Sequence, residues 1–188
     1  MIKKTVSTVS LLLLLLNFGG FCQKTGEGTL FKQPLLITSA GQSADVQIAS
    51  ILAKRAGLTY TLSKTATKKD LEKVKTLVLV LGASMKGLGA AGLDVNKEKK
   101  RVKMLMEEAK KKNIPLFCLH LGGESRRGKL SDELIKAFLP SSKMAIVIKS
   151  GNRDGLFSKI CKENNISLVE VEKAAQAIEP FREAFELQ

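Results

Sequence analysis

The sequence predicts an α/β fold, a three-layer doubly wound parallel sheet of the Rossmann-like or flavodoxin-like kind with about five to six strands. Two observations predict this class. Apolar segments of strand length alternate with amphipathic segments of helix length from residue 35 onward. Residues 76–81, TLVLVL, are apolar on both sides of a strand, which is typical of the centre of a parallel sheet. Since crossovers in such sheets are right-handed, all strands end at one edge, where ligands bind near the reversal of strand order.

The first half of the domain is expected to begin with a strand and a capped helix. Ser43 is placed to cap a helix that ends before Gly57, with Ile48, Ile51 and Leu52 on one face. The segment after this helix alternates apolar with polar residues, which favours a strand at the edge of the sheet. The elements predicted here are a strand at 35–38, a helix at 43–56, a strand at 58–62, a short helix at 68–74 and a strand at 76–81.

The second half continues the alternation. A glycine-rich connection at 82–96 leads to a helix whose apolar residues recur with helical spacing between Val102 and Ala109. Ser131 and Asp154 are placed to cap two later helices. The elements predicted here are helices from 97, 131 and 154, strands at 115–119, 144–148 and 166–171, and a helical tail at 173–185 broken at Pro180.

The amino-terminal segment predicts export. Residues 1–22 combine a basic start, a short apolar stretch and small residues, as secretory signals do. We therefore expect the protein in the periplasm, in the cell envelope or outside the cell. Two alternatives are a retained membrane anchor, although the apolar stretch is short for a span of about 20 residues, and a lipid attached to Cys22. Residues 23–34 are polar and are predicted to be a tether, and residues 35–188 a single α/β domain.

Charge and composition narrow the partners. The chain has 31 Lys and Arg against 18 Asp and Glu, and loss of residues 1–22 would leave 29 against 18. It has no Trp, one Tyr and no interleaving of basic with aromatic residues, so we expect no nucleic-acid binding. Anionic envelope polymers, an envelope protein or small anions are the expected partners. Cys118 and Cys161 lie among apolar residues and are expected to be buried free thiols, with a disulfide as the alternative.

Polar residues gather in four loops that follow predicted strands, at 39–43, 82–92, 121–128 and 149–155. Glycine lets backbone N–H groups approach a ligand closely, although turns and helix caps account for part of these residues. Basic side chains in the same loops predict an edge that attracts anions: Lys86, Arg126, Arg127, Lys149 and Arg153. The candidate ligand-binding residues are Ser39, Gln42, Ser43, Ser84, Lys86, His120, Gly122, Gly123, Arg126, Arg127, Asn152 and Arg153.

Four phrases in these loops carry a resemblance to a known family. They are SAGQS, GASMKGLGAAG, HLGGESRRG and KSGNRDG, and the similarity extends over residues 35–172. The chain resembles a family of secreted prokaryotic α/β domains of unknown function. The resemblance implies an exported α/β domain and no established activity.

Known nucleotide-binding motifs fit these loops poorly. Residues 123–129 match the phosphate-loop pattern G-x-x-x-x-G-K, but Leu130 stands where a metal-binding Ser or Thr is required. Residues 87–92 match G-x-G-x-x-G, yet the next predicted helix begins several residues later, whereas a dinucleotide loop joins its strand and helix tightly. One histidine and scattered carboxylates give no metal-ligand spacing, so we expect no metal and no cofactor.

The alternative function is a hydrolase. Residues 82–86, GASMK, miss the nucleophile elbow G-x-S-x-G at the last position, where Lys86 stands. Ser84 and His120 remain candidates for catalysis on an ester or phosphate substrate. We expect instead that the loop edge binds a small anionic ligand or an envelope partner. An anion would take backbone N–H groups near Ser43 and Gly123, with Arg126 or Arg127 adding charge and His120 beside them.

Overall fold

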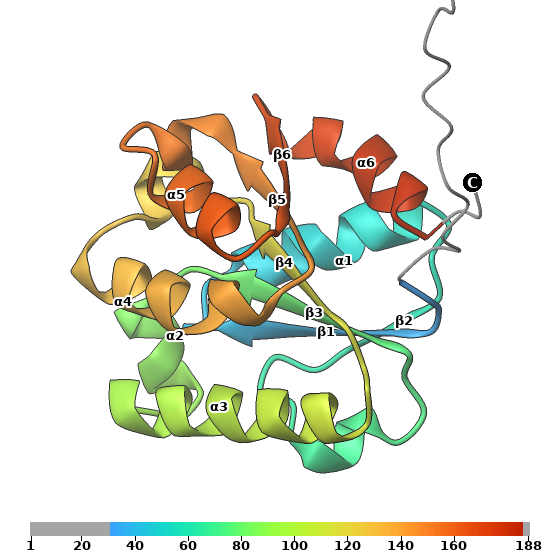
Figure 1. Cartoon of the computed structure of the whole chain (residues 1–188). Coiled ribbons are helices and arrows are strands. Elements are labelled where there is room, and N and C mark those ends of the chain that lie inside the picture. The colour runs from blue at the N-terminus through green and yellow to red at the C-terminus, as the bar shows by residue number, and fades with distance from the viewer. Residues whose placement is uncertain (1–30, 186–188) are drawn as a thin grey trace, which may run out of the picture.

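The computed structural model describes residues 31–185. The predicted signal, Cys22 and the tether up to residue 30 lie outside this part of the chain. Its six strands form one parallel sheet in the order β2-β1-β3-β4-β5-β6 (Figure 1). The strands are β1 (Leu35–Ala40), β2 (Tyr60–Leu62), β3 (Thr76–Leu81), β4 (Leu116–His120), β5 (Met144–Ile148) and β6 (Ser167–Val171).

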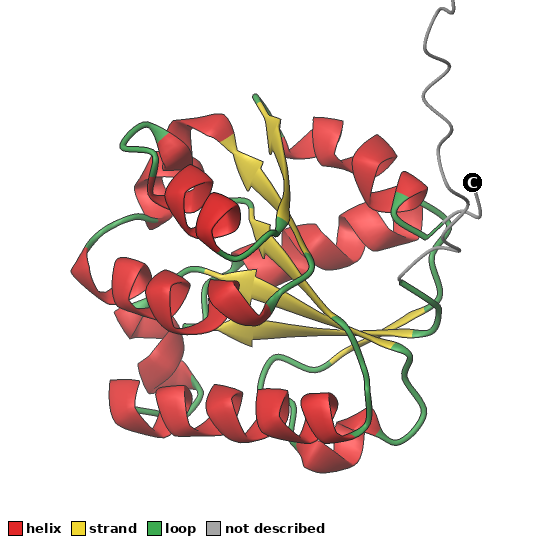
Figure 2. Cartoon of the chain, in the orientation of Figure 1, coloured by secondary structure: helices red, strands yellow, loops and turns green. Residues whose placement is uncertain are grey.

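Helices cover both faces of this sheet (Figure 2). Helices α1 and α6 contribute to the hydrophobic cluster on one face, and α3, α4 and α5 to the cluster on the other. The predicted three-layer α/β class is therefore confirmed. The helices are α1 (Asp45–Arg55), α2 (Met85–Ala90), α3 (Val95–Lys111), α4 (Lys129–Phe138), α5 (Leu156–Glu163) and α6 (Ile178–Glu183), with 3₁₀ turns η1 (Lys68–Leu71), η2 (Gly123–Arg126), η3 (Leu139–Ser141), η4 (Lys149–Asn152) and η5 (Ala174–Ala177).

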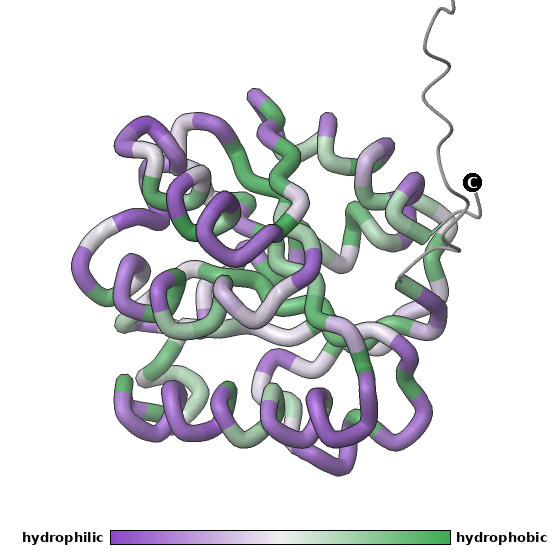
Figure 3. Tube along the Cα trace, viewed as in Figure 1, coloured by the Kyte–Doolittle hydropathy of each residue, from purple (hydrophilic) through white to green (hydrophobic). Residues whose placement is uncertain are grey.

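Strand alternation divides the core in two. Leu35 and Ile37 of β1 pack in the cluster that includes α1, whereas Leu36 between them packs in the cluster that includes α3. Every residue of β1 and β3 is buried, as expected of strands covered on both faces. The hydropathy of the chain follows this division, with apolar strands inside and polar helix surfaces outside (Figure 3). Cys118 and Cys161 are both buried and free, as predicted.

The strand order shows where the sheet reverses direction of growth, which is where the sequence predicts a ligand site. Strand β1 pairs with β3 on one side, in register from Leu35 opposite Thr76 to Ala40 opposite Leu81, and with β2 on the other. The order therefore reverses between β1 and β3, as the sequence predicted. We call the edge formed by the strand carboxyl ends the carboxyl edge, and the opposite edge the amino edge. No helix within residues 31–185 is long and apolar enough to cross a bilayer.

Two predicted helix caps are wrong. Helix α1 has Ala44 at its N-cap without a side-chain hydrogen bond, and Ser43 lies one residue earlier. Ser131 lies inside α4, which begins at Lys129, and its hydroxyl accepts a hydrogen bond from Ala83 N at 3.0 Å. Both serines thus contribute to the carboxyl edge instead of stabilising the first turn of a helix.

Two other local predictions also need correction. The glycine-rich connection at 82–96 contains a short helix, α2, which Ser84 caps by accepting from Gly87 N at 3.1 Å. Pro180 does not break the helical tail, because it lies in the first turn of α6, where a missing backbone N–H costs nothing. The break falls earlier, between η5 and α6.

Candidate functional site

The loop between β1 and α1 has an unusual backbone conformation, which contacts with distant residues hold in place. Gly41 has a φ of 109°, and a Cβ there would lie 2.5 Å from Gly82 O, so a larger residue does not fit. Gln42 also has a positive φ, of 59°, which is uncommon for a residue other than glycine. Its side chain holds it there, since Nε2 donates to Lys64 O at 3.0 Å and to a carboxylate oxygen of Glu98 at 3.1 Å. Gln42 is therefore a scaffold for this loop.

A buried ion pair on α3 braces the same loop from below. Glu98, 1% exposed, accepts from Gly41 N at 2.9 Å through Oε1. Arg101 bonds to both oxygens of Glu98 at 2.8 Å and donates to Ser39 O at 2.5 Å. Charge-assisted hydrogen bonds of this kind are stronger than neutral ones, so the loop is held firmly. Neither residue was among those predicted from the sequence, because both lie in a lysine-rich helix whose composition is typical of a solvated surface.

Three side-chain oxygens near this loop are buried without a hydrogen bond, although one of them, Asp45 Oδ2, lies within ion-pair distance of Arg126. They are Ser39 Oγ, Ser43 Oγ and Asp45 Oδ2, and they are all the buried side-chain polar atoms without a hydrogen bond within residues 31–185. Their residues are 0%, 2% and 5% exposed. A buried polar group left unsatisfied costs about 1–3 kcal/mol, and native proteins contain few of them. All three oxygens belong to residues 39–45, where β1 ends and α1 begins, which makes this part of the chain unusual. Asp45 was not among the residues predicted from the sequence.

Arg126 lies beside the last of these residues, Asp45. Its Nε is 3.3 Å from Asp45 Oδ2 and 3.5 Å from Asp45 Oδ1. A Cβ added to Gly82 would lie 3.4 Å from Ser43 Oγ and 3.6 Å from Arg126 Cβ, so these groups are near one another. A Cβ on Gly122 would overlap the Arg126 side chain and lie 2.6 Å from Asp45 Oδ2. We call the place where Ser43, Asp45, Gly82, Gly122 and Arg126 lie close together the crevice.

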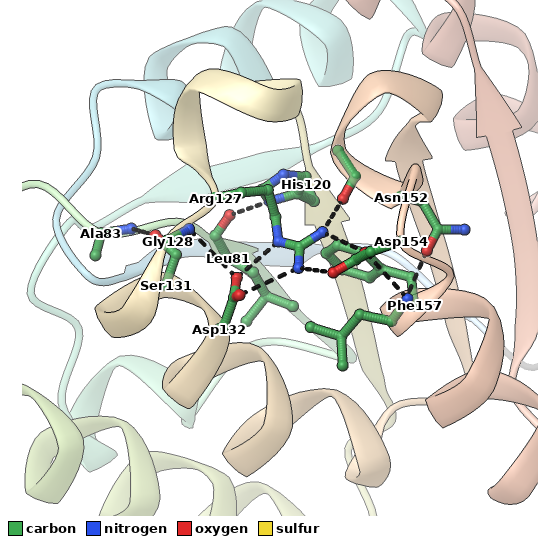
Figure 4. A network of polar contacts seen from close by, with 12 residues as sticks. Leu81, Ala83, His120, Arg127, Gly128, Ser131, Asp132, Asn152, Asp154 and Phe157 are labelled. Atoms are coloured by element: carbon green, nitrogen blue, oxygen red, sulfur yellow. Dashed lines mark hydrogen bonds and ion pairs between the residues drawn. The ribbon is translucent and has the colours of Figure 1, made fainter.

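Arg127, the neighbour of Arg126, is held in a different network (Figure 4). Its guanidinium bonds to both oxygens of Asp132, at 2.7 and 3.2 Å, and to both oxygens of Asp154, at 2.9 and 2.7 Å. It also donates to Gly151 O and lies 5.8 Å from the centroid of the Phe157 ring. These bonds to Asp154 and Asp132 raise the pKa of Arg127 and lower the pKa of both carboxyls, that of Asp154 to about 2.

All five N–H groups of the Arg127 guanidinium therefore have acceptors in the fold. Its network ties the start of α4, through Asp132, to the loop before α5, through Asp154. The sequence left open whether Arg126 or Arg127 faces a ligand, and the geometry favours Arg126. Within residues 31–185 no bond engages the two terminal nitrogens of Arg126, and its side chain is 31% exposed.

His120 is fully buried beneath this network. Its Nδ1 lies 2.9 Å from Leu81 O and its Nε2 lies 3.1 Å from Gly123 O. Burial lowers the pKa of His120, and the two carbonyl contacts partly oppose that effect. A Cβ on Gly151 would lie 2.7 Å from the ring, so the backbone closes over it. His120 thus joins the ends of β3 and β4 to η2 as an internal tie.

The other predicted residues lie on the carboxyl edge in structural roles. Ser84 caps α2, and Lys86 is exposed beside it. Asn152 is buried and its Oδ1 accepts from Phe157 N at 2.8 Å, while Asp154 Oδ1 accepts from Leu156 N at 3.2 Å, so Asn152 shares with Asp154 the capping that was expected of Asp154 alone. Arg153 is exposed and pairs with Glu124 at 2.6 Å.

The charges of this edge are largely compensated. Four of the five cations predicted to attract anions each pair with a carboxylate: Arg126 with Asp45, Arg127 with Asp132 and Asp154, Lys149 with Glu172, and Arg153 with Glu124. The general anion-attracting field is therefore weaker than the sequence suggested, and selectivity for an anion would depend on Arg126. No group of three potential metal-ligating side chains occurs in the described region.

Comparison with known proteins gives a family and distant structural neighbours. No curated protein matches the chain. A protein of Desulfitobacterium hafniense DCB-2 that is assigned to the G-D-S-L lipolytic family aligns with a TM-score of 0.33 and 15% identity, over 72% of this chain and 75% of that one. A GDSL-like lipase of Bacteroides thetaiotaomicron VPI-5482 aligns with a TM-score of 0.34 and 14% identity, over 72% and 66%.

The sequence profile of one family matches nearly the whole domain. It covers residues 32–185 and is described as Domain of unknown function (DUF6305). The match confirms the resemblance to a family of unknown function that the loop phrases indicated. The chain belongs to the DUF6305 family.

Proposed function

We propose that this domain binds a small polar ligand in the crevice. The observation that carries the proposal is the buried Ser43 hydroxyl, which has no hydrogen bond, near the buried Asp45 carboxylate, whose Oδ2 has only the partly exposed Arg126 as a partner. A bound ligand that donates hydrogen bonds to them removes the cost of burying them unsatisfied. The position of the crevice also supports the proposal, because ligands of doubly wound folds bind at the carboxyl edge where the strand order reverses.

The groups around the crevice define what a ligand should carry. Asp45 Oδ2 can only accept, so it requires an O–H or N–H donor, and the Ser43 hydroxyl can accept or donate. The terminal nitrogens of Arg126 require an anionic or strongly polar acceptor. A small molecule with a carboxylate next to a hydroxyl or amino group meets both requirements. This ligand class narrows the small anionic ligand expected from the sequence.

The geometry does not favour the alternative hydrolase that uses Ser84 and His120. The Ser84 hydroxyl accepts from Gly87 N, and both ring nitrogens of His120 face carbonyl oxygens. No hydrogen bond joins the two side chains within the described residues, so the serine lacks the adjacent base that activates a nucleophile.

A thermal-shift screen tests the proposal. Lactate and alanine carry both a carboxylate and a donor, whereas propionate has the carboxylate alone. We expect lactate or alanine to raise the melting temperature more than propionate does. Arg126→Ala should weaken binding at least tenfold, because a charge-assisted hydrogen bond contributes about 1.5–3 kcal/mol. Arg153→Ala is the matched control on the same edge and should bind as the parent does.

Two outcomes would overturn the proposal. One is a panel in which no small carboxylate or hydroxylated compound stabilises the protein. The other is turnover of an ester or phosphate substrate that Arg126→Ala leaves unchanged, which would indicate an enzyme whose site lies elsewhere.

We also propose that the domain acts outside the cytoplasm. The support is the composition of residues 1–22, and the partners would be envelope molecules, with membrane contact limited to an anchor or a lipid on Cys22. Mass spectrometry of the native protein tests this. Loss of about 22 residues supports export, a diacylglycerol mass on Cys22 supports the lipid, and an intact cytosolic chain contradicts both.

A further inference from the structure

A large cleft lies at the amino edge, opposite the crevice. It has a volume of about 920 Å³ and is lined by the second half of α3, the end of α4 with η3, and the starts of β3 and β4. A second cleft of about 560 Å³ adjoins it and shares Asn113, Ile114 and Pro115. Ligand pockets typically measure about 300–1,000 Å³, so the first cleft alone can hold a molecule with a dozen or more heavy atoms.

The larger cleft has an apolar floor and a basic rim. Its lining includes the partly exposed Met106, Ile114 and Pro140, which offer hydrocarbon surface, with the buried Leu116 and Phe138 behind them. Lysines surround these residues, with Lys103, Lys110 and Lys143 in the larger cleft and Lys32, Lys75 and Lys112 in the smaller one. Long lysine side chains can lay their methylene groups along an apolar surface while the ammonium groups stay in water.

The lysines of this edge are almost free of acidic partners. Lys103 lies 4.0 Å from Glu107 in an exposed pair, and within residues 31–185 no carboxylate lies within ion-pair distance of the other five. Glu72 and Glu107 are the two acidic residues of the combined lining. The carboxyl edge is the reverse case, because its cations are paired. The clefts therefore carry a net excess of lysines over carboxylates, and low-dielectric walls strengthen the positive potential that such an excess produces.

We propose that the amino-edge cleft is a second binding site, which takes an anionic amphiphile with a single hydrocarbon chain and a carboxylate head. The hydrocarbon chain would lie on the floor formed by Met106, Ile114 and Pro140, and the carboxylate would lie among Lys103, Lys110 and Lys143. The apolar floor and the lysine rim together favour an amphiphile over a ligand that is only charged or only apolar. A plain anion site needs no apolar floor, and a purely apolar site would be destabilised by desolvating lysines. This site is independent of the crevice and of its proposed ligand.

Calorimetric titration of the full chain with dodecanoate, below its micelle-forming concentration, tests the site. We expect saturable binding of dodecanoate and none of butanoate, which lacks the chain, or of dodecyltrimethylammonium, which has the opposite charge. Lys110→Glu combined with Lys143→Glu should weaken dodecanoate binding at least tenfold. The matched control is Lys54→Glu combined with Lys159→Glu, which makes the same change in net charge at exposed positions of α1 and α5 and should bind as the parent does.

Three results would overturn the inference. Equal affinity for butanoate and dodecanoate would indicate a simple anion site. Equal weakening by both lysine pairs would indicate a general charge effect. Binding to anionic phospholipid vesicles without any binding of free dodecanoate would indicate that this face contacts a membrane surface instead of enclosing a single chain.

Discussion

Arg126 and Asp45 are 81 positions apart in the sequence, yet Arg126 Nε lies 3.3 Å from Asp45 Oδ2 at the edge of the crevice. Asp45 is 5% exposed, whereas the Arg126 side chain is 31% exposed. The carboxylate is thus fixed inside the protein and the guanidinium is the more accessible partner. The proposed ligand would reach Asp45 by displacing Arg126, which would then stay beside it as an anion contact.

Removal of Arg126 should destabilise the protein mainly through Asp45. Arg126→Ala leaves a buried carboxylate without its counter-ion, whereas the same substitution in an Asp45→Asn background does not. A double-mutant cycle measured by urea unfolding should give a coupling free energy of about 0.5–2 kcal/mol. Additive effects of the two substitutions would show that the contact contributes nothing to stability.

Ser43→Ala should stabilise the unliganded protein and impair ligand binding. The substitution removes a buried hydroxyl that lacks a partner, so we expect a gain of about 1 kcal/mol in the free energy of unfolding. Ser142→Ala is the matched control, because Ser142 is equally buried but donates to Leu139 O at 2.8 Å. It should lose about 1 kcal/mol instead. If Ser43→Ala is destabilised to the same degree, the Ser43 hydroxyl is satisfied in solution and the case for the crevice weakens.

The ion pairs of Arg127 should make the free energy of unfolding fall at low pH. The pKa of Asp154 is lowered to about 2 in the folded protein, and an unfolded aspartate has a pKa of about 3.9. The unfolded state therefore binds protons first, so this stabilisation is complete above about pH 4 and is lost as the pH falls toward 2. Because Asp154 is 58% exposed, solvent screens the effect and we expect it to be modest. Urea unfolding between pH 2 and pH 6 should show a shallower acid dependence for Arg127→Leu than for the parent.

Gly122→Ala should close the crevice. The added methyl group would overlap the Arg126 side chain and lie 2.6 Å from Asp45 Oδ2, so both must move. We expect a loss of about 1–3 kcal/mol in stability together with loss of ligand binding. Gly89→Ala in α2 is the control, since a Cβ there meets nothing within 4 Å. It should be neutral or should stabilise the protein by up to about 1 kcal/mol. Similar losses for both variants would contradict the packing described for Gly122.

The sequence was informative where a single segment determines the outcome. Residues 76–81 are apolar on both faces, and β3 lies inside the sheet with every residue buried. The loops 39–43 and 82–92 do flank the reversal of strand order, because right-handed crossovers leave few other arrangements. Glycines in the predicted loops also marked tight packing, since Gly41 and Gly122 stand where a side chain cannot fit.

Side-chain roles depended on contacts that no local pattern encodes. Arg126 and Arg127 are adjacent and chemically identical, but the chain turns between them, so that one reaches Asp45 and the other reaches Asp132 and Asp154. Glu98 and Arg101 differ little in sequence context from their solvated lysine neighbours, and their importance comes from the loop that packs against them. Periodicity predicts which face of an element is buried, but pairing between distant charges requires the assembled structure.

The two cysteines have a consequence for how the protein withstands oxidants. Burial raises the pKa of Cys118 to about 12 and that of Cys161 to about 11, so at neutral pH almost no thiolate forms in the folded state. Peroxides, alkylating reagents and disulfide exchange all require the thiolate and access to it. The folded domain should therefore keep both sulfur atoms reduced in an oxidising compartment without help from a reductant. Labelling of Cys118 and Cys161 by a thiol reagent, measured separately from any labelling of Cys22, would then report unfolding of the domain.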